Sequence, residues 1–160
     1  MKKKKYISKK AQEHASKGTF IYLKKHTPDK VLTMKSGGHG QENIRFLKRK
    51  GITFGIDSEF SNGVRLGHID RHHDKRNTHK NGHTWFPKGW GRTEIKKAGE
   101  HIASLKRNQT LFDNHTHSGR YRGVSVGIIA RKGIIKTIFP LFDVNRHARK
   151  KAHIIPKSRR

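Results

Sequence analysis

The stretch GVSVGIIARKGIIKTIFP (residues 123–140) is the clearest structural signal in the chain. Two runs rich in valine and isoleucine, 123–130 and 134–140, are separated by RKG, a sequence typical of a tight turn. Pro140 marks the end of the second run, because proline cannot donate a hydrogen bond within a sheet. The stretch therefore predicts an antiparallel β-hairpin.

Upstream of this hairpin, residues 93–107 predict the clearest helix. Ile95, Ala98, Ile102 and Leu105 recur at helical spacing and form one apolar face. We expect this face to pack on a sheet.

A shorter helix and a second hairpin are predicted earlier in the chain. QENIRFLKRKG (41–51) places Ile44 and Leu47 on one helical face, with cations in the last turn and Gly51 at the C-terminal cap. Residues 52–69 then alternate apolar and polar side chains on both sides of the turn SNG. The order of helices and strand pairs predicts an α+β fold, with helices packed against small antiparallel β-sheets.

The chain of 160 residues has the length of a single domain. Residues 1–25 form a basic lead-in, in which TFIYL (19–23) can form one short strand or helical turn. After Asp143 the sequence becomes basic again, so residues 144–160 are expected to form a basic tail.

The charge of the chain points to a polyanionic partner. Lys and Arg number 38 against 11 Asp and Glu, which gives a formal net charge of +27. Nucleic acid is the leading candidate, because neutralising phosphates releases counterions and drives strong binding. An anionic membrane surface or an acidic protein would satisfy the same charge.

Several classes of protein are excluded or disfavoured by composition. No apolar run approaches the roughly 20 residues of a transmembrane helix, so no membrane insertion is expected. The basic start MKKKKYISKK is followed by polar AQEHASKG, which does not form a signal peptide. The chain has no cysteine, which excludes disulfides and thiolate zinc sites.

The chain's 13 histidines suit metal-independent cleavage of RNA. One histidine can deprotonate the 2′-hydroxyl and a second can protonate the leaving 5′-oxygen, since their usual pKa lies near 6.5. A cation beside the phosphate would stabilise the charge of the transition state. This chemistry needs no cofactor.

The most distinctive histidine is His39, in SGGHGQENI (36–44). Gly38 and Gly40 flank it just before a predicted helix start, so backbone N–H groups can approach a phosphate there. His39 can equally be an ordinary loop histidine beside a glycine-rich turn. His26, thirteen residues earlier, has no distinctive setting of its own.

Lys88 stands in the aromatic stretch GHTWFPKGWG (82–91), between Pro87 and Trp90. That setting can hold its ammonium group in one direction. Alternatively, the aromatic residues belong to the core and Lys88 is a solvated surface charge.

A polar loop from Asp70 to His83 is rich in histidine. Its HHD sequence, His72, His73 and Asp74, offers ligands for zinc or nickel. No second cluster with regular ligand spacing completes such a site, so a loop facing nucleic acid is favoured over a metal site.

The order of four motifs resembles the bacterial EndoU-type endoribonuclease toxin domains. The motifs are SGGHGQENIRFLKRKGI, NGVRLGHI, GHTWFPKGW leading into a helix, and GVSVGIIARKGIIKTIFP. The resemblance spans about residues 26–143, which we take as the nuclease domain. It implies helices against a pair of small antiparallel sheets.

The resemblance also implies an active site of two histidines and a lysine, which leaves a 2′,3′-cyclic phosphate. By position, His39 and Lys88 match the family's glycine-flanked histidine and its lysine. His26 matches the spacing of the other histidine, with His14, His68 and His83 as alternatives, the last two separated like the pair in the coronaviral uridylate-specific enzyme.

The resemblance further implies contacts with substrate from the closing strand. Thr137 matches a threonine near the base and sugar, and Phe139 stands where the family usually has tyrosine, so a hydroxyl is missing. Gly38, Gly40 and Trp90 are further candidates for substrate contacts, and no residue is assigned to a metal.

Such domains are often delivered into target cells as the C-terminal part of a larger secreted toxin and are neutralised by a cognate immunity protein. We therefore expect RNA, with tRNA as one candidate, and an acidic immunity protein as partners. The competing hypotheses are a non-catalytic RNA-binding protein and a metal-dependent nuclease using the HHD sequence.

Overall fold

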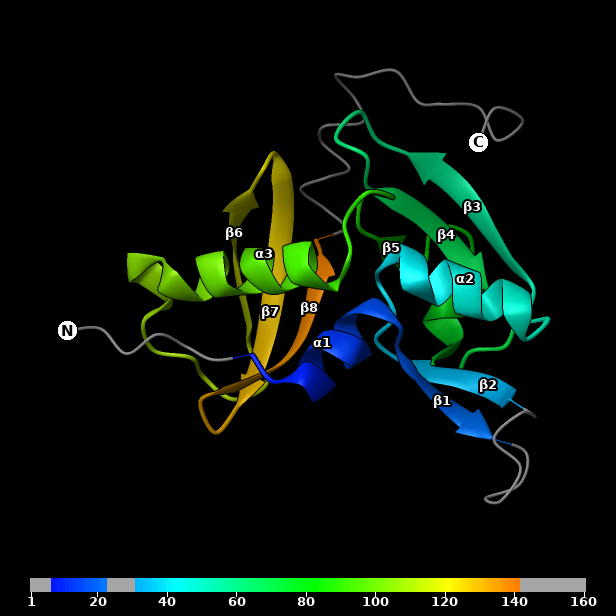
Figure 1. The fold of residues 1–160 in the computed structure, drawn as a ribbon, viewed down its shortest axis with the longest axis horizontal. Helices are drawn as coiled ribbons and strands as arrows, with labels where there is room; N and C mark the ends of the chain where they lie inside the picture. The colour runs from blue at the N-terminus through cyan, green and yellow to red at the C-terminus, as the bar shows by residue number, and fades with distance from the viewer. Residues whose placement is uncertain (1–6, 23–30, 142–160) are drawn as a thin grey trace.

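A computed structural model describes residues 7–22 and 31–141, where three α-helices and three small antiparallel sheets form an α+β fold (Figure 1). In chain order the elements are α1 (Lys9–Ser16), β1 (Thr19–Tyr22), β2 (Val31–Ser36), α2 (Gln41–Arg49), β3 (Phe54–Glu59), β4 (Arg65–Ile69), the 3-10 helix η1 (Lys75–Thr78), β5 (His83–Trp85), α3 (Arg92–Ser104), the 3-10 helix η2 (Lys106–Asn108), β6 (Thr116–Tyr121), β7 (Val124–Arg131) and β8 (Ile134–Pro140). The predicted fold class is confirmed, with three sheets in place of the implied pair.

The sheet β6–β7–β8 supports the first core. β7 and β8 are the predicted hairpin, and their turn holds Lys132 and Gly133 at φ 52° and 75°. α3 lies across this sheet in Figure 1, and α1 lies beside β8. Ile95, Ala98 and Ile102 of α3 are buried in this core, as their spacing predicted.

The sheet β3–β4–β5 and α2 enclose a second core. The predicted pairing of β3 with β4 is confirmed, and β5 adds a third strand that was not predicted. Buried residues of α2 pack here against this sheet and against the β1–β2 pair; the cluster is Phe20, Met34, Ile44, Phe46, Leu47, Ile52, Ile69 and Trp85.

The two cores meet at β5 and the residue that follows it. Trp85 is fully buried in the second core, whereas Phe86 is fully buried in the first. Adjacent side chains of an extended segment point in opposite directions, which explains this division. The aromatic stretch therefore joins the two halves of the molecule.

The segment 7–22 contains α1, a helix that was not predicted. Its apolar face consists only of Ala11 and Ala15, which is too weak to be read in a lysine-rich segment. Ser8 caps the helix by accepting a hydrogen bond from the N–H of Ala11 at 3.1 Å. β2 and β6 were missed as well. None of the described helices is long and apolar enough to cross a membrane.

Candidate functional site

The loop carrying His39 is held against the end of α1 by backbone pairing. Gly37 and Gly38 have φ values of 71° and 72°, a conformation that favours glycine. Three successive N–H groups of the loop donate to three successive carbonyls of α1: Gly38 to His14 (2.9 Å), His39 to Ala15 (2.6 Å) and Gly40 to Ser16 (3.0 Å).

Glycine is also needed in this loop because its neighbours leave no room for a side chain. A Cβ at Gly38 would overlap Met34 and Asn43, and a Cβ at Gly40 would overlap the hydroxyl of Ser16. Gly40 is the N-terminal cap of α2, so His39 precedes the positive end of a helix dipole.

The imidazole of His39 is partly buried and held by one of its nitrogens. Nδ1 lies 2.7 Å from the carbonyl oxygen of Thr84, so the Nδ1–H donates and the lone pair stays on Nε2. Burial, with smaller contributions from nearby His14 and His72, lowers the pKa of His39 from 6.5 to about 4. His39 is therefore neutral at pH 7.

The structure brings His14 of α1 to the same loop. Its Nδ1 lies 2.8 Å from the hydroxyl of Thr19, and its Nε2 lies against Gly37, where an added Cβ would be 2.9 Å away. Burial lowers the pKa of His14 below its usual value. His14 therefore lies near enough to influence the pKa of His39, while His26 lies outside the described residues.

Two buried histidines lie behind His39. The ring of His83 stacks on His39 with centroids 4.8 Å apart and planes 6° apart, and His72 lies 6.0 Å beyond. His83 Nε2 lies at hydrogen-bond distance, 2.7 Å, from the carbonyl oxygen of Gly38, and this contact helps to hold the glycine loop in place. Burial and the neighbouring His39 hold the pKa of His83 well below its usual value.

Lys88 lies in an exposed turn that begins beside His39. The N–H of Phe86 donates to the His39 carbonyl at 2.6 Å, and the N–H of Trp90 closes the turn on the Pro87 carbonyl at 2.9 Å. The ring of Trp90, a candidate for substrate contact, stacks on Phe86 with ring centroids 5.2 Å apart. One face of the Trp90 ring is therefore packed against the first core. The turn is anchored on both sides of Lys88, which is itself exposed.

Arg65 links the glycine loop to the Lys88 turn. This residue was not identified from the sequence. Its side chain is only 3% exposed. The guanidinium donates to the side chain of Gln41, next to the glycine loop, and to the carbonyl of Phe86 at 2.6 Å, next to the Lys88 turn. Burial lowers the pKa of Arg65 to about 10, which still leaves it charged at pH 7. A cation within an apolar strand was its only sequence signal.

β8 completes the surroundings of His39 on another side. The ring of Phe139 lies 6.0 Å from the His39 ring, and Gly127 on β7 provides the space for it. Thr137 is partly exposed two residues earlier on β8.

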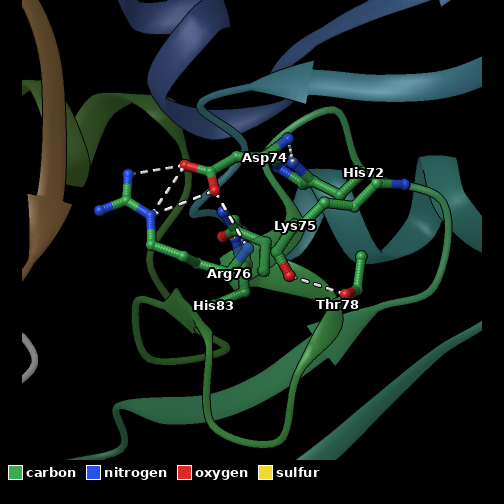
Figure 2. Close-up of polar contacts among 7 residues, drawn as sticks. His72, Asp74, Lys75, Arg76, Thr78 and His83 are labelled. Carbon is green, nitrogen blue, oxygen red and sulfur yellow. Dashed lines mark hydrogen bonds and ion pairs between the residues drawn. The ribbon is translucent and has the colours of Figure 1, made fainter.

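Several polar groups of the histidine-rich loop form hydrogen bonds with one another (Figure 2). His72 is buried and its Nδ1 accepts the N–H of Asp74 at 2.9 Å. The carboxylate of Asp74 pairs with Arg76 at 2.7 Å, which helps to lower the pKa of Asp74 to about 2. Among the described residues no group of three or more His, Asp or Glu side chains could hold a metal ion. His68 hydrogen-bonds to Asp57 at 3.0 Å.

The chain is thus a basic α+β domain with two partly buried histidines, His14 and His39, at one glycine loop. A family model described as bacterial EndoU nuclease matches residues 8–142. The chain therefore belongs to the bacterial EndoU nuclease family. No curated protein and no solved structure shows a significant match.

Proposed function

We propose that the chain is a metal-independent endoribonuclease that cleaves RNA by attack of the 2′-hydroxyl on the adjacent phosphorus. The observation that supports this most is that His14 and His39 lie at one loop, each with a hydrogen bond at Nδ1. In the proposal, Nε2 of each ring transfers the proton. Membership of the bacterial EndoU nuclease family supports nuclease activity as the general class.

His39 is the general base in this proposal. Its Nε2 takes the proton from the 2′-hydroxyl, whose oxygen forms a bond to phosphorus while the bond to the 5′-oxygen breaks. His14 gives a proton to that leaving oxygen, so the products are a 2′,3′-cyclic phosphate and a 5′-hydroxyl end. Because burial lowers the pKa of His14, the bound phosphate has to raise it by stabilising the charged ring.

Positive charge for the transition state comes from two places. The N-terminus of α2 follows directly after His39, and Lys88 extends from the turn tied to the His39 carbonyl. Both would stabilise the oxygens of the pentavalent phosphorus. Lys88 is proposed to complete its approach when substrate is bound, since apo geometry is often looser than the reacting complex.

The biological role that we propose is that of a toxin in bacterial competition. The domain would be delivered as part of a larger secreted protein, cleave RNA in the cytoplasm of the target cell, and be neutralised by an acidic immunity protein. The net charge of +27 supports both an RNA substrate and an acidic inhibitor.

The test uses a DNA oligonucleotide that contains one ribonucleotide, so that only one bond can be cut. We expect His14→Ala, His39→Ala and Lys88→Ala each to lower kcat/KM by about 10²–10⁴-fold in the presence of EDTA. Exposed residues of α3 supply matched controls, His101→Ala and Lys97→Ala, which should cleave like the wild type.

His26→Ala decides between the two candidates for the second histidine. Full activity of His14→Ala together with loss in His26→Ala would replace His14 with His26. Intact RNA after long incubation with the wild type would favour a non-catalytic RNA-binding protein, and loss of cleavage in EDTA would favour a metal-dependent nuclease.

A further inference from the structure

A groove of about 560 Å³ opens along α1, between β1 and β8. His14 belongs to its lining, so the groove begins at a residue of the proposed active site. Its other polar side chains come mainly from α1, and Lys136 of β8 borders it as well. The close approach of α1 to β8 is visible in Figure 1.

The charge of this groove suits a phosphate backbone. Lys10, Lys17 and Lys136 line it, and Glu13 is its one carboxylate, 4.0 Å from the Lys17 ammonium. Within residues 7–22 and 31–141, no ion pair occupies Lys10 or Lys136. Two ammonium groups are thus available to an anionic ligand.

β8 connects the groove to His39. Phe139 lies beside the His39 ring, and Lys136 lies three residues earlier on the same strand. At the rise of an extended chain these two positions are about 10 Å apart. A strand of RNA whose scissile phosphate lies at His39 could therefore continue into the groove.

The groove also offers an aromatic surface. Tyr22 lines it and is 38% exposed, so part of its ring is open to a ligand. Phe20, two residues earlier, is buried against Phe46 with ring centroids 4.4 Å apart and supports the base of the groove. Exposed rings beside cations are the elements with which proteins bind single-stranded nucleic acid.

We propose that this groove is a subsite for a nucleotide that flanks the cleavage site of single-stranded RNA. Lys10 and Lys136 bind its phosphates and Tyr22 stacks on its base. The proposal rests on the proposed function for the position of the scissile bond, but binding in the groove can be measured without cleavage.

The first experiment measures binding of a fluorescent 2′-O-methyl oligoribonucleotide, which cannot be cleaved by 2′-hydroxyl attack. Lys10→Gln/Lys136→Gln is compared with Lys9→Gln/Lys97→Gln, which removes the same charge from exposed helical lysines outside the groove. We expect the groove variant to raise Kd about 10-fold and to reduce the slope of log K against log salt by about 1.4, the value for two phosphate contacts on a single strand. The control should stay within about 2-fold of the wild type.

A second pair of variants tests the stacking. Tyr22→Ala should raise Kd about 10-fold, whereas Phe112→Ala, which removes an aromatic ring that is 59% exposed outside the groove, should not change it. Equal losses in groove and control variants would overturn the subsite, because they would show binding by diffuse charge.

Cleavage separates failure of the subsite from failure of the proposed function. The groove variant should cut a ribodinucleotide as the wild type does and should raise KM only for longer substrates. Cleavage by the wild type with unchanged binding in the groove variant overturns the subsite alone. A wild type that cleaves neither substrate, with binding weakened in the groove variant, overturns the proposed function and supports the groove as a single-strand binding site.

Discussion

The glycine loop at His39 and the histidine-rich loop at residues 70–83 differ in how they hold their histidines. The second loop contains four histidines, and the structure buries His72 and His83 while leaving His73 and His79 exposed. His39 is in an intermediate position, partly buried and held by one nitrogen. The surroundings of His39, and not the local number of histidines, therefore make it the candidate for the proposed proton transfer.

The strongest test of this difference is the stability of His83→Ala against that of His39→Ala. His83 is 2% exposed and pairs with Gly38, so its truncation leaves a cavity and an unpaired carbonyl. We expect the free energy of unfolding to fall by about 3–5 kcal/mol for His83→Ala. For His39→Ala we expect a loss of about 1 kcal/mol. Urea denaturation at pH 7 measures both values.

The cleavage activity of the same two variants should not follow their stability. His39→Ala should remain folded and lose cleavage, whereas His83→Ala should keep cleavage activity in the fraction of the protein that remains folded. A folded His83→Ala protein without any cleavage would instead assign His83 to the chemistry, which was one of the alternatives from the sequence.

The sequence predicted the elements whose apolar residues are regularly spaced. α2 and the hairpins β3–β4 and β7–β8 lie within the predicted segments, and α3 begins one residue before its predicted segment. α1 and β6 were missed, because one buries only small alanines and the other, THSGRY, has no apolar alternation. Their positions depend on tertiary packing and not on local pattern.

The candidate site was predicted where a local motif marks it. The glycines around His39 were identified from the sequence, and their φ values and close contacts explain why glycine is needed. The pairing with His14 depends on backbone hydrogen bonds between α1 and a loop more than twenty residues later, which no local pattern encodes. Arg65 was missed for the same reason. The domain boundaries, His26 and the roles of His39, Lys88, Thr137 and Phe139 stay predictions.

The pH dependence of the free energy of unfolding should also report on the environment of His39. The pKa of His39 is lowered from 6.5 to about 4 in the folded state, so the unfolded chain binds more protons between these pH values. This contribution to stability is complete above pH 6.5 and is lost as the pH falls toward 4. Its full size is up to about 3 kcal/mol, and partial exposure of His39 reduces it.

Urea denaturation of wild type and His39→Gln across this range measures that contribution. The wild type should lose more stability than the variant between pH 6.5 and pH 4. The pKa of His83 is lowered by burial and by the neighbouring His39, so replacement of His39 also reduces the His83 contribution, in the same direction. Replacement of exposed His101 by glutamine should leave the slope as in the wild type, and identical slopes in wild type and His39→Gln would contradict the assigned shift at His39.

The smallest effect is expected in the histidine-rich loop, at His73→Ala. His73 is exposed, and its backbone N–H donates to the carbonyl oxygen of Met34 at 2.7 Å. Alanine retains this hydrogen bond. We therefore expect kcat/KM within about 2-fold of the wild type, as for other exposed substitutions away from a site. A 10-fold loss that is accompanied by sensitivity to EDTA would show that His73 binds a metal ion with His72 or Asp74, because neither the proposed proton transfer at His39 nor folding requires its ring. That result would transfer the chemistry from the glycine loop to the histidine-rich loop.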